Sequence, residues 1–553
     1  MVRIYIANEG DTLHKIANRN QIDIAELLSL NLHIADPNRS IAGKQVKLPA
    51  IGIPSTNYIP PSCPPAAPLD YLNTWIPLTP LEQMAETEYD VLIVGSGAGG
   101  GAALWRLCEQ WKANGKRIGI VEAGDPILPT HAFNIPTLNQ NRFQSLFQNI
   151  EIPIGKNLPE FPGATQLYAL GGRTLFWTAV TPRMLSSEIQ GWPITSKEMN
   201  LYYNIAERVM NVTQGYTAGS SISQILLDRL QRSRFTQAAA YPMAVDLQPT
   251  QYGNVHSNVF FSSMNFFAYA LNLRPFDLAV RARAIRVAAE NGKVMGVEVM
   301  SPDKKSYFLK SKIVVLAAST FETPRILLYS GIKGRAIGHY LTNHSFITAT
   351  GKLTRNEFPE VLGTLGIIIP QTEEYPYQFQ MFGPGPYFWY HYEEEPLRKE
   401  WPIVFQGFGV VESRFDNQVF LNPYKRDAYG VPEIQIQFSH NERDKAIIRQ
   451  MSQDMRLVSN VTGVPLISTN GENPICLMPP GIEYHATGTC RMGDESYNAA
   501  TNRYGEIFSV SGLFIADNSI LPTLPAANPT LTTVALAIRT ADYIIQTSPL
   551  GED

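Results

Sequence analysis

The chain has 553 residues, of which 44% are hydrophobic and 17% are charged, and its formal net charge is -4. A chain of this length exceeds what one hydrophobic core usually supports, and its composition is that of a globular protein, so we expect two or three folded domains rather than disorder. The weakly acidic balance, without a concentrated basic face, argues against nucleic acid as a partner.

The sequence contains no recognisable export or membrane signal. The N-terminal stretch "MVRIYIANEGDTLHKIANRN" has no apolar run long enough for a signal peptide, and no stretch elsewhere reaches about 18 uninterrupted apolar residues. We therefore expect a soluble, cytoplasmic protein without a membrane span. The four cysteines are scattered, so neither a disulfide framework nor a metal site is expected.

Residues 1–50 have the pattern of a small unit of their own. "VRIYIA" alternates like a strand, "LHKIANRN" and "DIAELLSLN" have helical periodicity, and "GKQVKLP" closes the unit with a strand. With its Gly-Asp-Thr-Leu, Glu-Leu-Leu and Gly-x-x-Val-x-Leu-Pro motifs, the stretch resembles a LysM module of βααβ fold. The resemblance implies binding of glycans that contain N-acetylglucosamine, such as peptidoglycan or chitin, and leaves a cell-wall association open. The alternative is a LysM-like fold kept for docking.

Residues 51–88 are dense in proline, in "IGIPSTNYIPPSCPPAAPLDYLNTWIPLTPLEQ". Such a composition favours an extended, stiff linker over a packed element. We therefore expect the second folded part of the chain to start near Tyr89.

A dinucleotide motif follows in "YDVLIVGSGAGGGAALWRL", an apolar strand that leads through a glycine-rich turn into a helix. Gly95 allows the tight turn, Gly97 lets a pyrophosphate approach the backbone, and Gly100 lets the helix pack closely on the strand. A second strand, "RIGIV", ends at Glu122, which is expected to accept a hydrogen bond from the ribose 2′-hydroxyl. Strand, motif, helix, strand and terminal acid together predict a Rossmann-type nucleotide site.

Two later segments continue this nucleotide domain. "VRARAIRVAAENGKVMGVEVM" has the pattern of a β-hairpin, and "KIVVLAASTFETPRILLYSG" that of a strand entering a helix. A nucleotide domain that is interrupted and resumed in this way is typical of flavoproteins, so FAD is the expected cofactor.

From Tyr89 to Ile545 the chain resembles a glucose-methanol-choline (GMC) oxidoreductase. Beyond the glycine motif, the likeness rests on "ALGGRTLFWTAVTPRM", "WPITSKEMNLYYNIAERVMNV", "VVLAASTFETPRILLYSG", "IGHYLTNH", "YHATGTCRMG" and "LFIADNSILPTLPAANPTLTTVALAIRTADYI", in this order. The resemblance implies an FAD-dependent oxidoreductase of alcohols or sugars with an α/β fold. Its parts would be an FAD-binding domain with inserted substrate-domain segments (89–345), a mainly α+β substrate-binding domain (346–475) and a C-terminal FAD-binding and catalytic segment (476–553).

Within that family the chain most resembles pyranose 2-oxidases and related sugar oxidoreductases, in "GGRTLFWTAVTPRM" and "NPTLTTVALAIRTADYI". The pyranose oxidases carry a histidine covalently bonded to the flavin, and this chain has Phe176 at the matching place. We therefore expect FAD to be bound without a covalent link.

Oxidising an alcohol requires removal of a hydroxyl proton and a carbon-bound hydride. Histidine suits the first task because its pKa lies near working pH, and flavin N5 accepts the hydride. By the resemblance, His485 in "EYHATGT" matches the catalytic histidine and Asn528 its partner, which would hold the substrate hydroxyl beside His485. Asn528 is also the expected N-cap of a helix with Pro529 in its first turn, and His344 in "LTNH" is expected to be structural.

The remaining candidate cofactor contacts are weaker. The free amides of Thr530 and Leu531, at the start of the last helix, are expected to stabilise the negative charge of reduced flavin. Thr178 is a candidate hydrogen-bond neighbour of flavin N5 or O4, and Asp517 is expected beside the pyrophosphate or ribityl chain. Two glycines would let their loop approach the flavin, namely Gly171 and Gly172.

The substrate and the electron acceptor, oxygen or a quinone-type compound, stay open. The aromatic-rich segment "QFQMFGPGPYFWYHYEEEPLRKEW" fits an entrance that stacks on a sugar ring or a flat apolar ring, or else an oligomer contact. Two other functions are compatible with the sequence: a GMC protein with other chemistry, such as a lyase or a photoenzyme, and a glycan-binding or anchoring protein with a degenerate flavin domain. The intact pair of His485 and Asn528 argues against the first of these.

Overall fold

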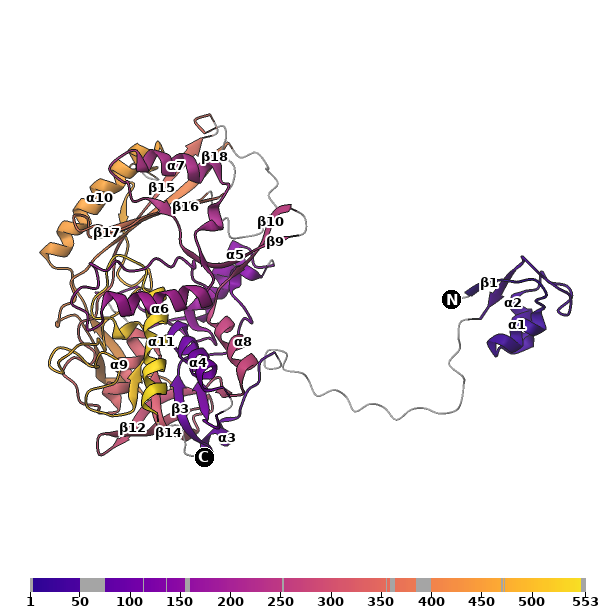
Figure 1. The fold of residues 1–553 in the computed structure, drawn as a ribbon, viewed down its shortest axis with the longest axis horizontal. Coiled ribbons are helices and arrows are strands. Elements are labelled where there is room, and N and C mark those ends of the chain that lie inside the picture. Colours follow the sequence, from indigo (N-terminus) through magenta and orange to yellow (C-terminus); the bar gives the residue numbers. More distant parts are fainter. Residues whose placement is uncertain are drawn as a thin grey trace. The chain divides into compact units, whose positions relative to one another are not determined.

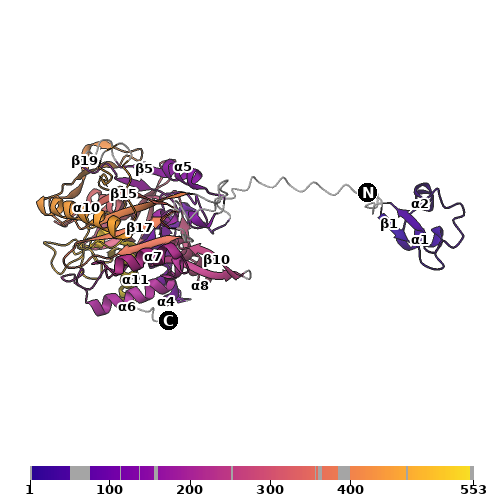
Figure 2. The same cartoon turned by 90° about the horizontal axis from the view of Figure 1, so that it is seen from above.

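The chain divides into two compact units, residues 1–70 and 71–553 (Figures 1 and 2). The computed structural model describes residues 3–49, 75–112, 114–135, 137–154, 160–250, 253–354, 356–358, 364–383, 399–468, 471 and 473–548. Residues 51–74 of the predicted linker and residues 384–398 of the aromatic-rich segment lie outside the described residues.

The first unit has the predicted βααβ order. Its two strands pair antiparallel, and Thr12 and Asp23 cap the two helices by accepting backbone N–H bonds. One face of each helix is apolar and packs on the sheet, which gives the unit a small core that includes Leu13, Ile16 and Val46. The elements are β1 (Arg3–Ile6), α1 (Leu13–Asn20), α2 (Ile24–Leu30) and β2 (Gln45–Leu48).

The second unit contains a seven-stranded sheet in the order β11-β4-β3-β14-β13-β12, with β22 beside β14. β11, β4, β3, β14 and β22 run parallel to one another, whereas β13 is antiparallel to both β12 and β14 and forms a meander with them. The meander contains the predicted hairpin. The strands are β3 (Glu88–Val94), β4 (Ile118–Val121), β11 (Asp277–Ala279), β12 (Arg283–Glu290), β13 (Lys293–Met300), β14 (Ser306–Leu316) and β22 (Leu513–Ile515).

Helices cover this sheet because its parallel strands are apolar on both faces. α4 packs against α8 and α11, and α11 also packs against α6 (Figure 1). α9 follows β14 directly, as predicted. The helices are α4 (Ala98–Trp111), α6 (Ser196–Val209), α8 (Ser263–Leu273), α9 (Ser319–Tyr329) and α11 (Thr530–Thr547).

A second, antiparallel sheet has the order β21-β15-β18-β17-β16-β8. α7 and α10 pack on it (Figure 1). A separate apolar core lies between them and the sheet. Its strands come from residues 239–477, so this part of the unit begins before residue 346. The elements are α7 (Ser221–Gln231), β8 (Ala239–Ala240), β15 (Ser345–Thr354), β16 (Leu365–Ile369), β17 (Tyr377–Gly383), β18 (Glu400–Gly409), α10 (Glu442–Thr462) and β21 (Cys476–Leu477).

The folded unit starts earlier than the sequence predicted. Ile76, Leu81 and Met84 are buried in the main core, so residues 75–88 are packed and do not belong to a linker. The remaining elements are α3 (Leu81–Ala85), α5 (Gln140–Ile150), β5 (Glu151–Pro153), β6 (Thr165–Leu167), β7 (Val212–Thr213), β9 (Met243–Thr250), β10 (Gly253–Phe260), β19 (Gln418–Arg426) and β20 (Pro432–Gln437).

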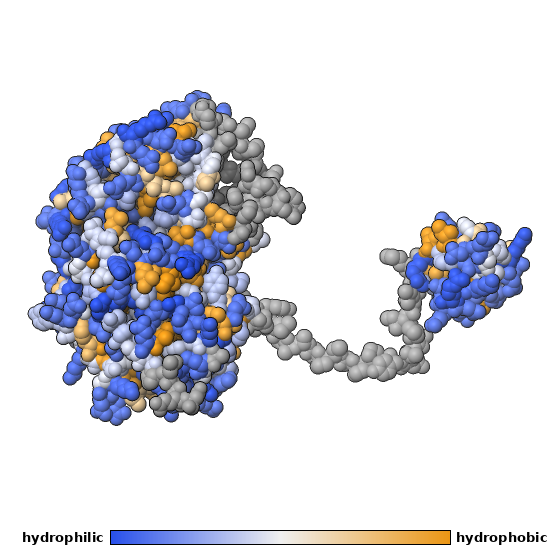
Figure 3. Space-filling model, viewed as in Figure 1, coloured by the Kyte–Doolittle hydropathy of each residue, from blue (hydrophilic) through white to orange (hydrophobic). Residues whose placement is uncertain are grey.

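Polar residues cover most of the surface seen in Figure 3, with apolar residues scattered in small patches. A search of the described residues for a helix that is both long and apolar enough to cross a bilayer finds none.

Candidate active site

The predicted glycine motif lies between the end of β3 and the start of α4. Gly95 has a φ of +100°, a left-handed conformation that favours glycine, and a Cβ there would collide with the backbone of Ala317. A Cβ at Gly100 would collide with the carbonyl oxygen of Gly95. These two glycines therefore have the geometry that the motif predicted, a tight turn and close helix packing.

Gly97 is the N-cap of α4, and no side chain caps that helix end. A Cβ built at Gly97 would meet no atom within 4 Å, so the space in front of this residue is empty. The first-turn amides of a helix are unpaired donors at the positive end of the helix dipole. The empty space and the unpaired amides together suit an anionic group such as a diphosphate.

Glu122 follows β4 and is 7% exposed. Its Oε2 accepts from the backbone N–H of Ser96 (3.0 Å) and from the Ser96 hydroxyl (2.6 Å), and its Oε1 accepts from the N–H of Gly124 (2.8 Å). Burial raises the pKa of the Glu122 carboxyl, against these hydrogen bonds. This carboxyl group also lies in the wall of the cavity along the glycine motif.

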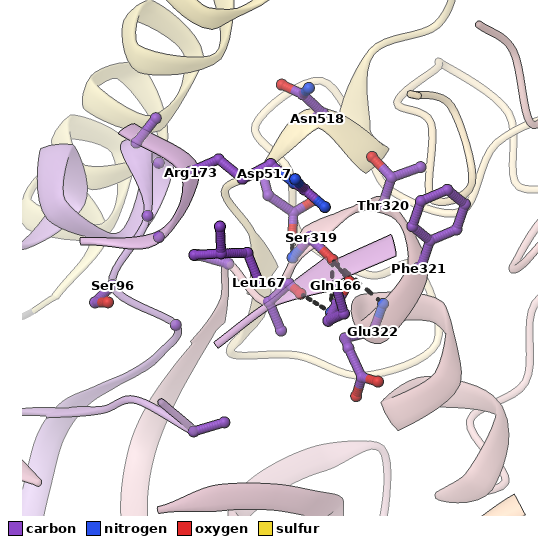
Figure 4. A pocket seen from close by; sticks show the side chains of 18 of the residues that line it. Ser96, Gln166, Leu167, Arg173, Ser319, Thr320, Phe321, Glu322, Asp517 and Asn518 are labelled. Atoms are coloured by element: carbon purple, nitrogen blue, oxygen red, sulfur yellow. Dashed lines mark hydrogen bonds between the residues drawn. The ribbon is translucent and has the colours of Figure 1, made fainter. Parts of the chain in front are cut away.

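A cavity of about 240 Å³ runs along the glycine motif (Figure 4). Its walls come from the β3–α4 turn, the end of β4, residues 165–177, the start of β12 and the N-terminal turns of α9 and α11. Gly100, Gly171, Thr178, His485, Asn528 and Leu531 are not in its lining; a direct chain neighbour of each of them lines it, except for Asn528. The predicted cofactor residues that do line it are Gly95, Gly97, Glu122, Gly172, Asp517 and Thr530.

Asp517 joins several elements at this cavity, and Figure 4 shows it close to Ser319. Its Oδ2 accepts from the Ser319 amide (3.0 Å) and the Thr323 hydroxyl (2.5 Å), and its Oδ1 accepts from the amide (2.9 Å) and hydroxyl (2.5 Å) of Ser519. The carboxylate thus connects the start of α9 with the turn after β22. Its immediate role is to fix two walls of the cavity.

The loop of the "GGRTLFWT" motif approaches the glycine turn closely. Gly172 has a φ of +56°, and a Cβ there would lie 3.1 Å from the Cα of Gly97. From this loop the cavity is lined by Gly172, Arg173, Thr174 and Trp177, whereas Thr178 is exposed. The sequence identified the loop but did not single out Thr174 as a lining residue.

His485 and Asn528, about 40 residues apart in the chain, lie next to each other. The Nδ2 of Asn528 is 3.4 Å from the Nε2 of His485. Asn528 is not the helix N-cap that the sequence predicted, because α11 begins at Thr530 with Pro529 as its cap and without a side-chain cap bond. Its amide oxygen instead accepts from two buried glutamines, Gln378 (2.9 Å) and Gln380 (2.6 Å). Both glutamines stand at the start of the aromatic-rich segment, and no motif in the sequence marks them as partners of Asn528.

His344 is part of the same network, beyond its predicted structural role. Its Nε2 lies 2.7 Å from the carbonyl oxygen of Pro525, and its Nδ1 lies 3.0 Å from the Nδ1 of His485. A carbonyl only accepts, so the His344 Nε2 carries the proton and its Nδ1 is a lone pair. The Nδ1 of His485 must then donate to it, which leaves the Nε2 of His485 as a lone pair that faces Asn528.

Both histidines are held neutral by their surroundings. Burial, with a further contribution from His344, keeps the pKa of His485 well below its usual range, and burial lowers the pKa of His344 to about 4. Phe408 packs near both rings, with centroid distances of 5.5 Å to His485 and 5.6 Å to His344. His485 therefore presents an unprotonated Nε2 at neutral pH.

The start of α11 leaves backbone amides free near the cavity. The first bond of this helix turn runs from the Thr533 amide to the Pro529 oxygen (2.9 Å), so the amides of Thr530 and Leu531 precede the hydrogen-bonded part of the helix. Thr530 itself lines the cavity. In the described part of the chain no cluster of three or more His, Cys, Asp or Glu side chains could hold a metal ion.

Comparison with known protein families agrees with this geometry. Family models described as GMC oxidoreductase match residues 261–346 and 413–537, and a LysM domain model matches residues 5–49. The chain is a GMC oxidoreductase with an N-terminal LysM domain. It is therefore an alcohol oxidoreductase, and its cofactor is FAD. The residues present fit that cofactor, since the empty space at Gly97, the N-terminus of α4 without a side-chain cap and the carboxyl group of Glu122 all border one cavity.

Relatives of this GMC oxidoreductase include sugar-oxidising enzymes. It is 28% identical to a C-glycoside 3-oxidase of Arthrobacter globiformis, over 70% of this chain and 75% of the relative. It is 20% identical to a pyranose 2-oxidase of Tricholoma matsutake, over 71% and 74% of the two chains. Among solved structures, the formate oxidase of Aspergillus oryzae superposes with a TM-score of 0.61 at 13% identity, over 83% of this chain and 98% of that one.

Proposed function

We propose that this GMC oxidoreductase oxidises a primary or secondary alcohol group of a sugar, glycoside or polyol, with His485 as the base that removes the hydroxyl proton. The observation that carries the proposal is the His344–His485–Asn528 arrangement, in which the hydrogen-bond partners leave only Nε2 of His485 as a proton acceptor. FAD, when bound, accepts the hydride from the alcohol carbon at its N5.

His485 can act as a base because its hydrogen bonds already leave Nε2 as the unprotonated nitrogen. When Nε2 takes the hydroxyl proton, the ring becomes an imidazolium whose Nδ1–H remains bonded to the lone pair of His344. That hydrogen bond stabilises the imidazolium, whereas the buried surroundings destabilise it. His485 therefore releases the proton again after the reaction. Asn528 provides an N–H donor beside Nε2 that orients the substrate oxygen.

The cofactor-holding roles follow from the geometry of the cavity. Gly95, Gly97 and Gly100 together with the α4 amides would bind the diphosphate, and Glu122 would accept a ribose hydroxyl. At the other end, the amides of Thr530 and Leu531 would stabilise the negative charge of the reduced ring. Gly171, Gly172 and Asp517 would shape the walls, and Thr178 remains a candidate neighbour of flavin N5 or O4.

The proposed substrate class rests on two relatives, which are named C-glycoside 3-oxidase and pyranose 2-oxidase. Oxygen and a quinone-type compound are the two candidate acceptors. An anaerobic screen of sugars, glycosides, polyols and sterols for bleaching of the flavin absorbance tests the proposal, and reoxidation with oxygen or quinone then separates the acceptors. If no alcohol bleaches the flavin, the oxidoreductase proposal fails in favour of a degenerate flavin domain.

We expect FAD to be bound without a covalent link. Phe176, at the place of the histidyl linkage in pyranose oxidases, is 7% exposed and packs against Phe143 and Phe147, with ring centroids 5.7 and 5.4 Å away. A phenyl ring has no atom that can bond to the flavin methyl group. Acid precipitation should release all of the yellow colour into the supernatant, and colour in the pellet would contradict the prediction.

The LysM domain would bind a glycan that contains N-acetylglucosamine and bring the enzyme to it. Residues 1–50 fold around their own core, so their removal takes no side chain from the cavity or from the histidine pair. We expect the truncated protein to keep its turnover of small substrates and to lose any retention on peptidoglycan or chitin. Poor turnover by a truncated protein that still holds FAD would place the domain in the active site.

A further inference from the structure

Two glutamines surround the amide oxygen of Asn528. Gln378 and Gln380 alternate along β17, so both side chains point to the same face of the sheet, and they are 2% and 3% exposed. Each donates an Nε2–H to the Oδ1 of Asn528, at 2.9 and 2.6 Å. β17 lies between β16 and β18 in the middle of its sheet, so these donors sit on a rigid element.

These two bonds fix which way the Asn528 amide faces. The oxygen and nitrogen of a side-chain amide exchange places by a half-turn about one bond, and the surroundings decide which orientation is adopted. With two donors directed at one side, Oδ1 must occupy that side and Nδ2 must face Nε2 of His485, 3.4 Å away. The opposite orientation would set Nδ2 against two donors and Oδ1 against the lone pair of the base.

We propose that Gln378 and Gln380 are positioning residues that hold the Asn528 amide with its N–H donors toward His485 and the substrate oxygen. The inference rests on the proposed role of His485 as base. In this arrangement the substrate oxygen meets a donor from Asn528 and an acceptor from His485, which is what an alcohol needs in order to give up its proton. The glutamines act through Asn528, so they change the rate of proton and hydride removal rather than the affinity for substrate.

A double-mutant cycle tests this. We expect the pair Gln378→Leu and Gln380→Leu to slow anaerobic flavin reduction by about tenfold with the substrate Kd unchanged, because two hydrogen bonds of ordinary strength are lost. In an Asn528→Ala background the same pair should change the rate by less than about twofold. An effect of full size in that background, or a Kd that the glutamine changes weaken even there, would mean that the glutamines contact the substrate directly, and would overturn the proposal.

An isosteric variant separates orientation from packing. Gln380→Glu keeps the side-chain shape but replaces a donor with an acceptor, which attracts the Nδ2 of Asn528 and turns Oδ1 toward His485. We expect Gln380→Glu to reduce the flavin more slowly than Gln380→Leu does, and an equal or faster rate would contradict the proposal. Gln437→Leu, at an exposed glutamine on β20, is the control for replacing a glutamine with leucine and should leave the rate unchanged.

A measurement without substrate keeps this inference separate from the proposed function. NMR spectra of the FAD-loaded protein with ¹⁵N-labelled histidine report the protonation state of His485. The groups that face its ring nitrogens are His344 and Asn528. Turning Oδ1 toward Nε2 favours a proton there, so Gln380→Glu should raise the pKa of His485. An unchanged His485 signal overturns the positioning role, whereas failure of the proposed function would appear as a wild-type flavin that no alcohol bleaches.

Discussion

Replacing His485 with alanine is expected to slow flavin reduction by about 10² to 10⁴-fold, the usual contribution of a positioned general base. The substitution removes the only lone pair that the hydrogen bonds of His344 and Asn528 leave directed at the substrate position. FAD should stay bound, because the glycine turn and Glu122 are untouched. Stopped-flow bleaching under anaerobic conditions measures the rate, and an unchanged rate would remove His485 from the role of base.

Asn528→Ala should cost less than His485→Ala, because it removes an oriented donor and not the proton acceptor. It should not weaken the start of α11, since Asn528 does not cap that helix. If both residues act on one hydroxyl, the double variant should lose less than the product of the two single effects. His440→Ala, a histidine that packs on Phe438 at 5.4 Å, is the matched control and should leave the rate unchanged.

The pH dependence of the wild-type rate gives an independent check on the base. The pKa of His485 is held well below its usual range, so the ring is neutral and competent above that lowered value. Lowering the pH from 7 through the usual histidine range should therefore leave the rate of flavin reduction unchanged, and the rate should fall only at more acidic pH. A fall centred on the ordinary histidine pKa would show that His485 is exposed to solvent or is not the base.

Gly97→Ala is expected to weaken FAD binding at least about tenfold while the chain still folds. The backbone of Gly97, with φ of -65° and ψ of -164°, is one that alanine can adopt, and the added Cβ would meet no protein atom within 4 Å. The methyl group would fill the space that the diphosphate needs. Thermal melting of the FAD-free protein measures its folding stability, and titration with FAD, followed by flavin fluorescence, measures the FAD affinity.

Gly99→Ala provides the contrast for Gly97→Ala. A Cβ at Gly99 would collide with the carbonyl oxygen of Ala516, so this variant should lose stability even without FAD. Equal FAD affinity in wild type and Gly97→Ala would contradict the assignment of the diphosphate to this turn.

Local patterns in the sequence were sufficient for the geometry of the glycine turn. Gly95 and Gly100 could be predicted because their positions within one strand–turn–helix–strand unit require glycine for backbone steric reasons, whereas the ribose-binding role of Glu122 stays a prediction. The βααβ order of the first unit could be predicted for the same reason, since short-range periodicity and caps define it.

The end of the linker and the cap of α11 were predicted wrongly from the same kind of pattern. Proline density between 51 and 88 indicated a linker, yet Leu81 and Met84 are buried, because their helix packs on the main core. Asn528 before Pro529 resembled a capping pair, yet its amide is bonded to β17 instead. In both cases contacts with distant segments outweighed the local preference.

By itself the sequence determined the family motifs and the glycine turn, and it predicted that His485 and Asn528 act as a pair. Only the tertiary structure decided how that pair is oriented. His344, which directly precedes β15, and the two glutamines of β17, Gln378 and Gln380, approach it from more than 100 residues away in the chain. Which nitrogen of His485 is free, and which way Asn528 faces, depends on these partners, because a histidine tautomer and an amide orientation are fixed by the hydrogen bonds around them and by nothing in the local chain.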